Sequence, residues 1–287
     1  MTMIGCGQGD GSPGDGSPSG PIVDPAAAPP LVSTLEIDPA TRDFLLTTNV
    51  GFYRIARASG RVTRVRPTVN AEGRVADLGP WVELAAGADG RLVGSGHPAE
   101  TGTVPELLGV IGSEDGGRSW RVLSRLGKSD LHKIVLKHDR MYAIDSPIGA
   151  LIVSRDGGRT FSEQFTPTGV LIADFEVDPG DPRRIIAAGD AEVFRSVDGG
   201  VRWERIGDGS GSRLAWPARD ALYRALKDGS VQRSADDGTS WKTVGRVDGE
   251  PYRMKAVSRD ELYLVIGDGT ILHTRDGAKT WEAAFTP

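Results

Sequence analysis

The sequence predicts an all-β protein, a six-bladed β-propeller that follows a disordered N-terminal segment. Three observations support this prediction. The chain of 287 residues contains 39 glycines and 18 prolines, which interrupt helices and suit a fold with many turns. One turn motif occurs five times at intervals of about 40 residues, the length of a four-stranded propeller blade. Short runs of strand-forming residues fill the intervals between these turns.

The repeated turn has the same residue types in each copy. A Ser or Thr is followed by Asp, by a small residue and by an aromatic ring, and the successive aspartates are 41, 42, 38 and 40 residues apart. The Ser, Thr and Asp oxygens can accept hydrogen bonds from nearby backbone N–H groups, glycine supplies a positive φ, and the ring can fill the blade core. We therefore expect a structural role for these aspartates rather than calcium binding. The positions are Ser113, Asp115, Gly117 and Trp120; Ser154, Asp156, Gly158 and Phe161; Ser196, Asp198, Gly200 and Trp203; Ser234, Asp236, Gly238 and Trp241; and Thr274, Asp276 and Trp281.

The repeats also predict where the strands lie. In the last repeat we expect strands at 253–257, 261–266, 270–274 and 281–285. Residues 31–66 show the same order with a degenerate turn, which makes them a first repeat. Six repeats follow, with seven as the alternative if residues 67–90 form another sheet. Ala278 replaces glycine in the last turn, so we expect that turn to be strained or differently shaped.

The N-terminal segment differs in composition from the propeller predicted for residues 31–287. Residues 7–30 are almost entirely Gly, Ser, Pro, Asp and Ala, so residues 1–30 are predicted to be a disordered tether. The stretch Met3-Ile4-Gly5-Cys6 resembles the lipobox of bacterial lipoproteins. This resemblance implies a lipid on Cys6 and export to the extracytoplasmic side of a membrane. Only five residues precede Cys6, so it also implies a start farther upstream. The alternative is a lone cysteine in a flexible tail.

Charge and composition exclude several classes of partner. The net charge of −5 provides no basic field for nucleic acid. The single cysteine cannot form an intrachain disulfide, and no apolar run approaches the roughly 18 residues of a membrane span. We therefore expect a monomer that contacts the membrane only through Cys6, with a protein or glycan as its partner.

One end of the predicted ring carries the candidate site. In a propeller, the loops between the second and third strands of each blade share a face with the connections between blades. His97 in loop 95–106, Asp130 and His132 in connection 127–132, and Asp145 in loop 145–149 all belong to this face. Two imidazoles and two carboxylates could hold a divalent metal or a polar ligand. The alternative is that both aspartates cap turns and His97 is solvated. No cofactor is assigned beyond this possible metal.

The motifs resemble known families. The repeated turn is similar to the Asp-box, or BNR repeat, of sialidase-like propellers. Ser95-Gly-His97-Pro98 and Asp130-Leu131-His132 resemble a group of exported bacterial Asp-box propellers labelled as glycosyl hydrolases, in which the second motif usually reads Asp-Phe-His. More distantly, the repeat resembles the propellers of photosystem II assembly factors, which are binding scaffolds. The resemblance thus implies either a hydrolase or a scaffold.

The residues expected of a sialidase are mostly missing. The Arg-Ile-Pro motif that such enzymes carry on the first blade is closest to Arg54-Ile55-Ala56, which lacks the proline. Tyr252 and Glu250 are the one pair that could serve as a nucleophile and its partner. We therefore assign no catalytic residues and favour a membrane-tethered extracytoplasmic propeller that acts as a binding or assembly scaffold. The alternative is a glycoside hydrolase of sialidase-like fold.

Overall fold

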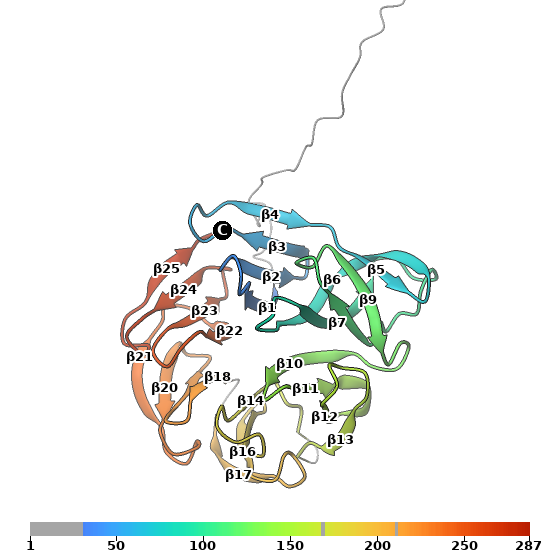
Figure 1. The fold of residues 1–287 in the computed structure, drawn as a ribbon. Helices are drawn as coiled ribbons and strands as arrows, with labels where there is room; N and C mark the ends of the chain where they lie inside the picture. The colour runs from blue at the N-terminus through green and yellow to red at the C-terminus, as the bar shows by residue number, and fades with distance from the viewer. Residues whose placement is uncertain (1–30, 168–169, 210–211) are drawn as a thin grey trace, which may run out of the picture.

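The protein is a ring of β-sheets (Figure 1), and a cavity lined by their inner strands, which we call the central channel, lies in the middle. The computed structural model describes residues 31–167, 170–209 and 212–287. Within these residues the only helix is the short 3-10 helix η1 (Ser146–Ile148), and no helix has the length and apolar character needed to cross a membrane. The tether predicted for residues 1–30, with Cys6, lies outside the described residues.

Five of the sheets are propeller blades of four antiparallel strands. Each blade is built from one continuous stretch of chain, and its strands follow sequence order from the channel outward. The first two blades are β1 (Val32–Ile37), β2 (Phe44–Thr48), β3 (Gly51–Ile55), β4 (Val62–Val65) and β10 (Leu131–Lys137), β11 (Arg140–Asp145), β12 (Ala150–Ser154), β13 (Ser162–Phe165). The third and fourth are β14 (Asp174–Val177), β15 (Ile185–Ala188), β16 (Glu192–Ser196), β17 (Glu204–Asp208) and β18 (Arg213–Ala218), β19 (Ala221–Ala225), β20 (Ser230–Ser234), β21 (Lys242–Arg246). The fifth is β22 (Pro251–Ala256), β23 (Leu262–Ile266), β24 (Ile271–Thr274), β25 (Glu282–Phe285).

The second repeat is not a regular blade, which corrects the prediction of six or seven blades to five. Its strands β5 (Thr68–Ala71), β6 (Arg74–Ala86), β7 (Leu92–Pro98), β8 (Val110–Ser113) and β9 (Ser119–Ser124) form a closed sheet. The cause is the length of β6. Its first part pairs with β5, its last part pairs with β7, and the register shifts between Leu78 and Val82. The sheet closes because β5 then pairs in parallel with β9, so residues 67–90 make no separate blade.

The inner strands complete the ring. β6 of the closed sheet contacts β1 on one side and β10 on the other, so the closed sheet takes the place between two blades. The first and last blades meet through β1 and β22, where the Arg253 guanidinium donates to the Ser33 carbonyl and Lys255 pairs with Glu36 at 2.7 Å. An apolar cluster spans the same seam, with Phe44 and Tyr263 in edge-to-face contact. Among the strands that the structure describes, none is shared between the first and last blades, so side-chain contacts close the ring.

Each repeated turn joins the last two strands of its sheet, and all five share one hydrogen-bond pattern. In the first copy, Ser113 Oγ donates to Asp115 Oδ1 at 2.9 Å and accepts the Gly117 N–H at 3.0 Å. Asp115 Oδ1 accepts the Ser119 N–H at 2.9 Å, and the hydroxyl of Ser119 donates to Oδ2 at 2.5 Å. The other four copies repeat the first three bonds. Each turn is thus held by its own side chains.

The five copies of the turn differ in the burial of the aromatic ring and, in the last copy, in the residue at the glycine position. Trp120 is fully buried, whereas Phe161, Trp203, Trp241 and Trp281 are half-buried and pack at the edges of apolar clusters. Ala278 adopts a φ of 70°, the left-handed conformation that glycine adopts elsewhere, and its N–H reaches Thr274 at 3.2 Å. The last turn therefore keeps the shape of the others with an alanine in a strained backbone position.

Candidate functional site

The site is built on the face of the ring where the inner strands begin. We call this the mouth face: it comprises the connections between sheets and the loops between second and third strands. A cavity of about 350 Å³ opens there between β6, β7, β10 and β22. We call it the mouth cavity, and its lining residues are Ser33, Trp81, Val82, Glu83, Ser95, His97, Asp130, Leu131, His132 and Arg253.

Three of the four candidate site residues meet at the mouth cavity. Asp130 directly precedes β10 and His132 is the second residue of that strand, while His97 lies near the end of β7 rather than in the loop that follows. Asp130 Oδ2 lies 2.8 Å from His132 Nε2, and Asp130 Oδ1 lies 3.5 Å from His97 Nε2. Ser95 fixes the position of this segment, since its hydroxyl accepts the Leu131 N–H at 3.0 Å. One carboxylate thus bridges two imidazoles at the edge of the cavity.

The two ionisable partners shift each other's protonation. The hydrogen bond with His132 lowers the pKa of Asp130, against the opposing effect of burial, and the charge of His97 adds to the lowering. The hydrogen bond with Asp130 raises the pKa of His132, again against burial. The pair therefore favours an ionised Asp130 beside a protonated His132. The His132 side chain is 61% exposed, so a bound molecule can reach its ring.

Asp145 does not belong to this site, which corrects its assignment as a candidate ligand. Its carboxylate is completely buried, and it accepts hydrogen bonds from Ser129 Oγ at 2.6 Å and from Arg125 Nη2 at 3.0 Å. It also faces the Asp130 N–H at 3.4 Å. These bonds join the end of β11 to the connection that leads into β10. Asp145 therefore has a structural role: it holds the connection before β10 against the end of β11, beneath the mouth face.

A divalent metal is not supported by this geometry. In the described part of the chain, no group of three or more His, Cys, Asp or Glu side chains is placed to hold a metal ion. The remaining histidines lie elsewhere: His138 Nε2 is 2.7 Å from the Asp178 carbonyl oxygen, and His273 is buried and stacked on Tyr263. The polar cluster at the mouth cavity is thus a hydrogen-bonded group.

Glu83 is a candidate site residue that sequence reasoning missed. It lies in β6 and lines two cavities, the mouth cavity and the channel between the inner strands beneath it. Its side chain is buried, and burial raises its pKa to about 7, although the charges of Arg253 and Lys133 oppose this rise. Glu83 thus changes its charge near neutral pH. Its signal in the sequence was a lone carboxylate between apolar residues in an inner strand, Trp81-Val-Glu-Leu.

Sequence reasoning also missed Arg253, which belongs to both cavities as well. Its Nε donates to the Ser33 carbonyl and its Nη1 donates to the Tyr252 carbonyl at 2.8 Å. Among the described residues it forms no ion pair with a carboxylate. Tyr252 and Glu250, the pair considered for catalysis, do not line the mouth cavity, and Glu250 is exposed.

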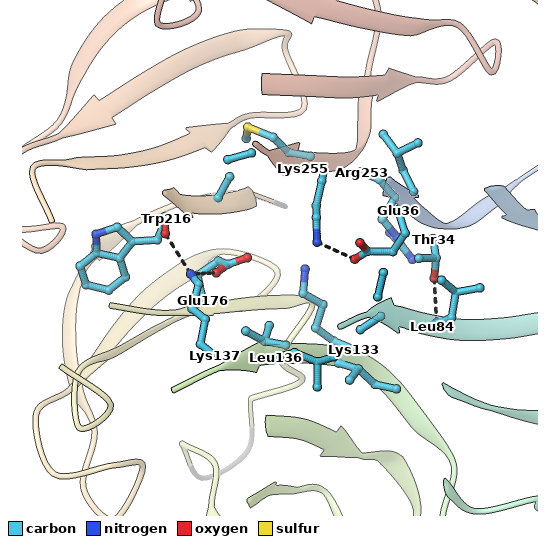
Figure 2. Close-up of a pocket in the computed structure, with 18 of the residues that line it drawn as sticks. Thr34, Glu36, Leu84, Lys133, Leu136, Lys137, Glu176, Trp216, Arg253 and Lys255 are labelled. Atoms are coloured by element: carbon cyan, nitrogen blue, oxygen red, sulfur yellow. Dashed lines mark hydrogen bonds and ion pairs between the residues drawn. The ribbon is translucent and has the colours of Figure 1, made fainter. Parts of the chain in front are cut away.

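Below the mouth cavity, paired charges fill the channel. Figure 2 shows Lys133, Lys137 and Lys255 extending toward the space between the inner strands. Each amine has a carboxylate partner on a neighbouring blade. Lys133 pairs with Asp174 at 2.8 Å, Lys137 with Glu176 at 2.7 Å, and Lys255 with Glu36 at 2.7 Å. The charges in this channel therefore largely neutralise one another and link adjacent blades.

Comparison with solved structures shows the propeller fold. The chain is similar to the GH74 enzyme of Niastella koreensis (TM-score 0.58, 15% identity), covering 89% of this chain and 37% of that enzyme. It is similar to YCF48 from Cyanidioschyzon merolae (TM-score 0.51, 14% identity), covering 90% of this chain and 86% of that protein. It is also similar to a structure of YCF48 bound to D1 peptide (TM-score 0.51, 14% identity), covering 90% of this chain and 82% of that one. A catalytically inactive virginiamycin B lyase from Staphylococcus aureus, solved with quinupristin, has a TM-score of 0.59 and 11% identity and covers 91% of this chain and 86% of the lyase.

These structural similarities do not identify the activity of this protein. The solved structures include glycoside hydrolases and binding proteins, and at such low identities they establish the fold alone. No protein-family model matches the chain, and a search of curated proteins found no match.

Proposed function

We propose that this protein is an extracytoplasmic binding or assembly scaffold, tethered to a membrane through a lipid on Cys6, that docks a protein or glycan partner on its mouth face. The observation that carries this proposal is where the exposed apolar side chains lie. Of the eight large hydrophobic side chains that are exposed among the described residues, five belong to the mouth face: Leu31, Val50, Trp81, Ile148 and Leu171. We take this concentration of exposed apolar side chains on one face as support for docking there.

Two further observations support a scaffold. YCF48, a protein of similar fold, has been solved bound to a peptide. The mouth cavity also offers both polar and aromatic surface, with Trp81 half-exposed beside His132 and Arg253. The turns of the five Asp-box motifs lie on the opposite face, so we assign them to holding the fold together.

Site-specific photo-crosslinking tests the docking face. A photoreactive residue is placed at Leu171 or Ile148 on the mouth face, and at Val197, which is 62% exposed on the opposite face, as the matched control. In the cells that naturally make the protein, the first two positions should give a discrete crosslinked product and Val197 should not. Equal products from both faces, or none from either, would contradict the proposal.

The lipid anchor has its own test. Expression from an upstream start should yield a protein whose Cys6 carries the mass of acyl chains, and Cys6→Ser should release the protein from membranes. An unmodified Cys6 in protein from the native membrane would overturn the tether.

A second candidate function is glycoside hydrolysis, which one observation favours. Glu83 and Asp130 both line the mouth cavity, and their surroundings move their pKa values in opposite directions, Glu83 up to about 7 and Asp130 down. A protonated acid beside an ionised carboxylate is the pair that such enzymes use. In this case Glu83 would be the general acid and Asp130 the base or nucleophile.

Fluorogenic sialosides and common glycosides separate the two functions. The scaffold proposal expects no turnover above buffer. Turnover that Glu83→Gln abolishes would establish the hydrolase at the mouth cavity. Turnover that Tyr252→Phe abolishes would instead place a sialidase-like nucleophile outside it.

A further inference from the structure

We propose that the mouth cavity binds an organic carboxylate, with the anionic group on Arg253 and Ser33 and the apolar part of the ligand against Trp81. This inference rests on the proposed function, because it names the ligand chemistry of the same binding face. The ligand is either a free organic acid or a carboxylate side chain of the docked partner.

Arg253 provides the positive charge. The lysines that line the channel all have carboxylate partners, whereas Arg253 donates only to the backbone carbonyls of Ser33 and Tyr252 among the described residues. Its Nη2 has no acceptor among the described residues, and Arg253 lines the mouth cavity. A guanidinium group recognises a carboxylate through parallel N–H donors, so it suits an oxyanion better than a neutral group.

Ser33 provides a second, independent donor. The residue is 8% exposed and lines the mouth cavity, yet its hydroxyl has no hydrogen-bond partner among the described residues. Buried hydroxyls normally have a partner, so an unpaired one at a cavity indicates a group that the ligand supplies. The Arg253 guanidinium binds the backbone carbonyl of this same serine at the seam between β1 and β22, and both residues line the mouth cavity.

The apolar part of the ligand has its own surface. The Trp81 side chain is 49% exposed, and Val82 and Leu131 add apolar lining. A volume of about 350 Å³ suits a small molecule or one side chain rather than a folded segment. A carboxylate that carries a ring or a short apolar chain fits this combination.

Glu83 determines when the anion can enter. The charged or polar groups around it are Arg253 from β22, Lys133 and His132 from β10, Asp174 from β14 and Thr34 from β1. Burial raises the pKa of Glu83 to about 7, so below neutral pH it is uncharged and does not repel a carboxylate. Above neutral pH Glu83 is ionised. An anion then binds more weakly, because either its charge is repelled by Glu83 or Glu83 must take up a proton when the anion binds.

Isothermal titration calorimetry of the full chain with phenylacetate and its neutral analogue phenylacetamide tests the inference at pH 6. Phenylacetate should bind about tenfold or more tightly than the amide, the usual value of a hydrogen bond to a charged group. Its affinity should fall between pH 6 and pH 8, and Glu83→Gln should reduce that fall, with the remainder due to the loss of positive charge on His132. An acetylated and amidated Phe-Glu dipeptide forms the second arm: tighter binding than phenylacetate indicates a partner side chain, and weaker binding indicates a free acid.

Variants connect this binding to the named donors. Arg253→Gln should weaken phenylacetate binding about tenfold or more, and Ser33→Ala by a smaller factor. Arg246→Gln, at an arginine whose side chain is 67% exposed on an outer strand, is the matched control and should bind like the wild type. Because the Ser33 hydroxyl has no partner to lose, Ser33→Ala should fold normally and decides the question if Arg253→Gln does not fold.

Three results would overturn the inference: equal binding of phenylacetate and phenylacetamide, no phenylacetate binding at millimolar concentration, or wild-type affinity in both variants. The crosslinking experiment uses no carboxylate. Mouth-face crosslinks without phenylacetate binding would therefore refute the ligand class and leave the docking face intact. Phenylacetate binding without crosslinks would do the reverse.

Discussion

At the scale of single residues, Glu83 and Asp145 are two buried carboxyl groups with different surroundings. Asp145 is completely buried, and its carboxyl oxygens accept hydrogen bonds from Arg125 and Ser129. Glu83 is buried where the two cavities meet, and there the cost of burial outweighs the attraction of Arg253 and Lys133. Asp145 is therefore suited to holding the structure together, and Glu83 to responding to pH.

The pKa of Glu83 predicts a pH-dependent stability. Its ordinary pKa of 4.5 applies to the unfolded chain, and the folded value is about 7. Between these pH values the unfolded chain has released the proton and the folded protein retains it, so rising pH favours unfolding, by about 3 kcal/mol over the window. Urea unfolding from pH 4.5 to 8 should show this loss in the wild type and little of it in Glu83→Gln.

The other groups with shifted pKa values affect the comparison of wild type with Glu83→Gln less than Glu83 does. The turn aspartates have lowered pKa values, so their contribution is lost only as pH falls below about 4. The raised pKa of His132 gives stability that is lost as pH rises. Its main cause, the hydrogen bond with Asp130, remains in both proteins, and only the smaller effect of the Glu83 charge is absent from Glu83→Gln. A decline of the same size in wild type and Glu83→Gln would show that Glu83 is not the buried acid.

At the scale of elements, the repeated turn depends on glycine where the chain is crowded. Gly117 has a φ of 87°, and a Cβ there would collide with the Phe52 ring. Gly60 has a φ of 68°, but a Cβ there would meet no atom within 4 Å. Gly117→Ala should therefore combine backbone strain with a packing clash and lower the free energy of unfolding by about 2–4 kcal/mol.

The matched control is Gly60→Ala, which adds only the strain, about 1 kcal/mol. Urea denaturation of both variants measures the difference. An equal loss in the two variants would mean that the turn of the second repeat does not pack against Phe52.

Much of the element structure could be predicted from the sequence because each strand ends at a turn with its own chemistry. The strands expected at 253–257, 261–266, 270–274 and 281–285 are present within two residues of their expected ends, as β22 to β25. The closed second sheet could not be predicted in this way. Its cause is the irregular pairing of β6 around Leu78 to Val82, and a register shift has no signature in residue types.

The candidate site was predictable where the repeat pattern placed residues on one face of the ring, and His97 of β7 does lie 3.5 Å from Asp130. Asp130 and His132 share a strand direction and do lie together, whereas Asp145, which ends β11, points into the structure toward Arg125. Glu83 and Arg253 lie 170 positions apart and meet only because the ring closes between β22 and β1. Charged residues that alternate along the inner strands were the available signal for the channel.

At the scale of the whole molecule, the ring closes through side chains. Glu36 is buried and pairs with Lys255 across the seam between β1 and β22. Lys255→Met leaves that carboxylate buried without its partner and should lower the free energy of unfolding by about 2–4 kcal/mol, with partial recovery in the double variant with Glu36→Gln.

A double-mutant cycle by urea denaturation measures the coupling of the seam pair. The exposed pair of Arg91 and Asp89 is the control, and its coupling should be below about 0.5 kcal/mol. Coupling at the seam no larger than at this surface pair would mean that apolar packing alone closes the ring.

The central claim is that the mouth face holds a partner, and the size of the particle extracted from native membranes tests it most directly. Wild-type protein should elute as a complex larger than the 30.5 kDa chain. The double variant Ile148→Glu and Leu171→Glu should elute as the free chain, and Val197→Glu with Val201→Glu on the opposite face should keep the complex. A free chain in the wild type, or a complex that survives the mouth-face variant, would contradict the account.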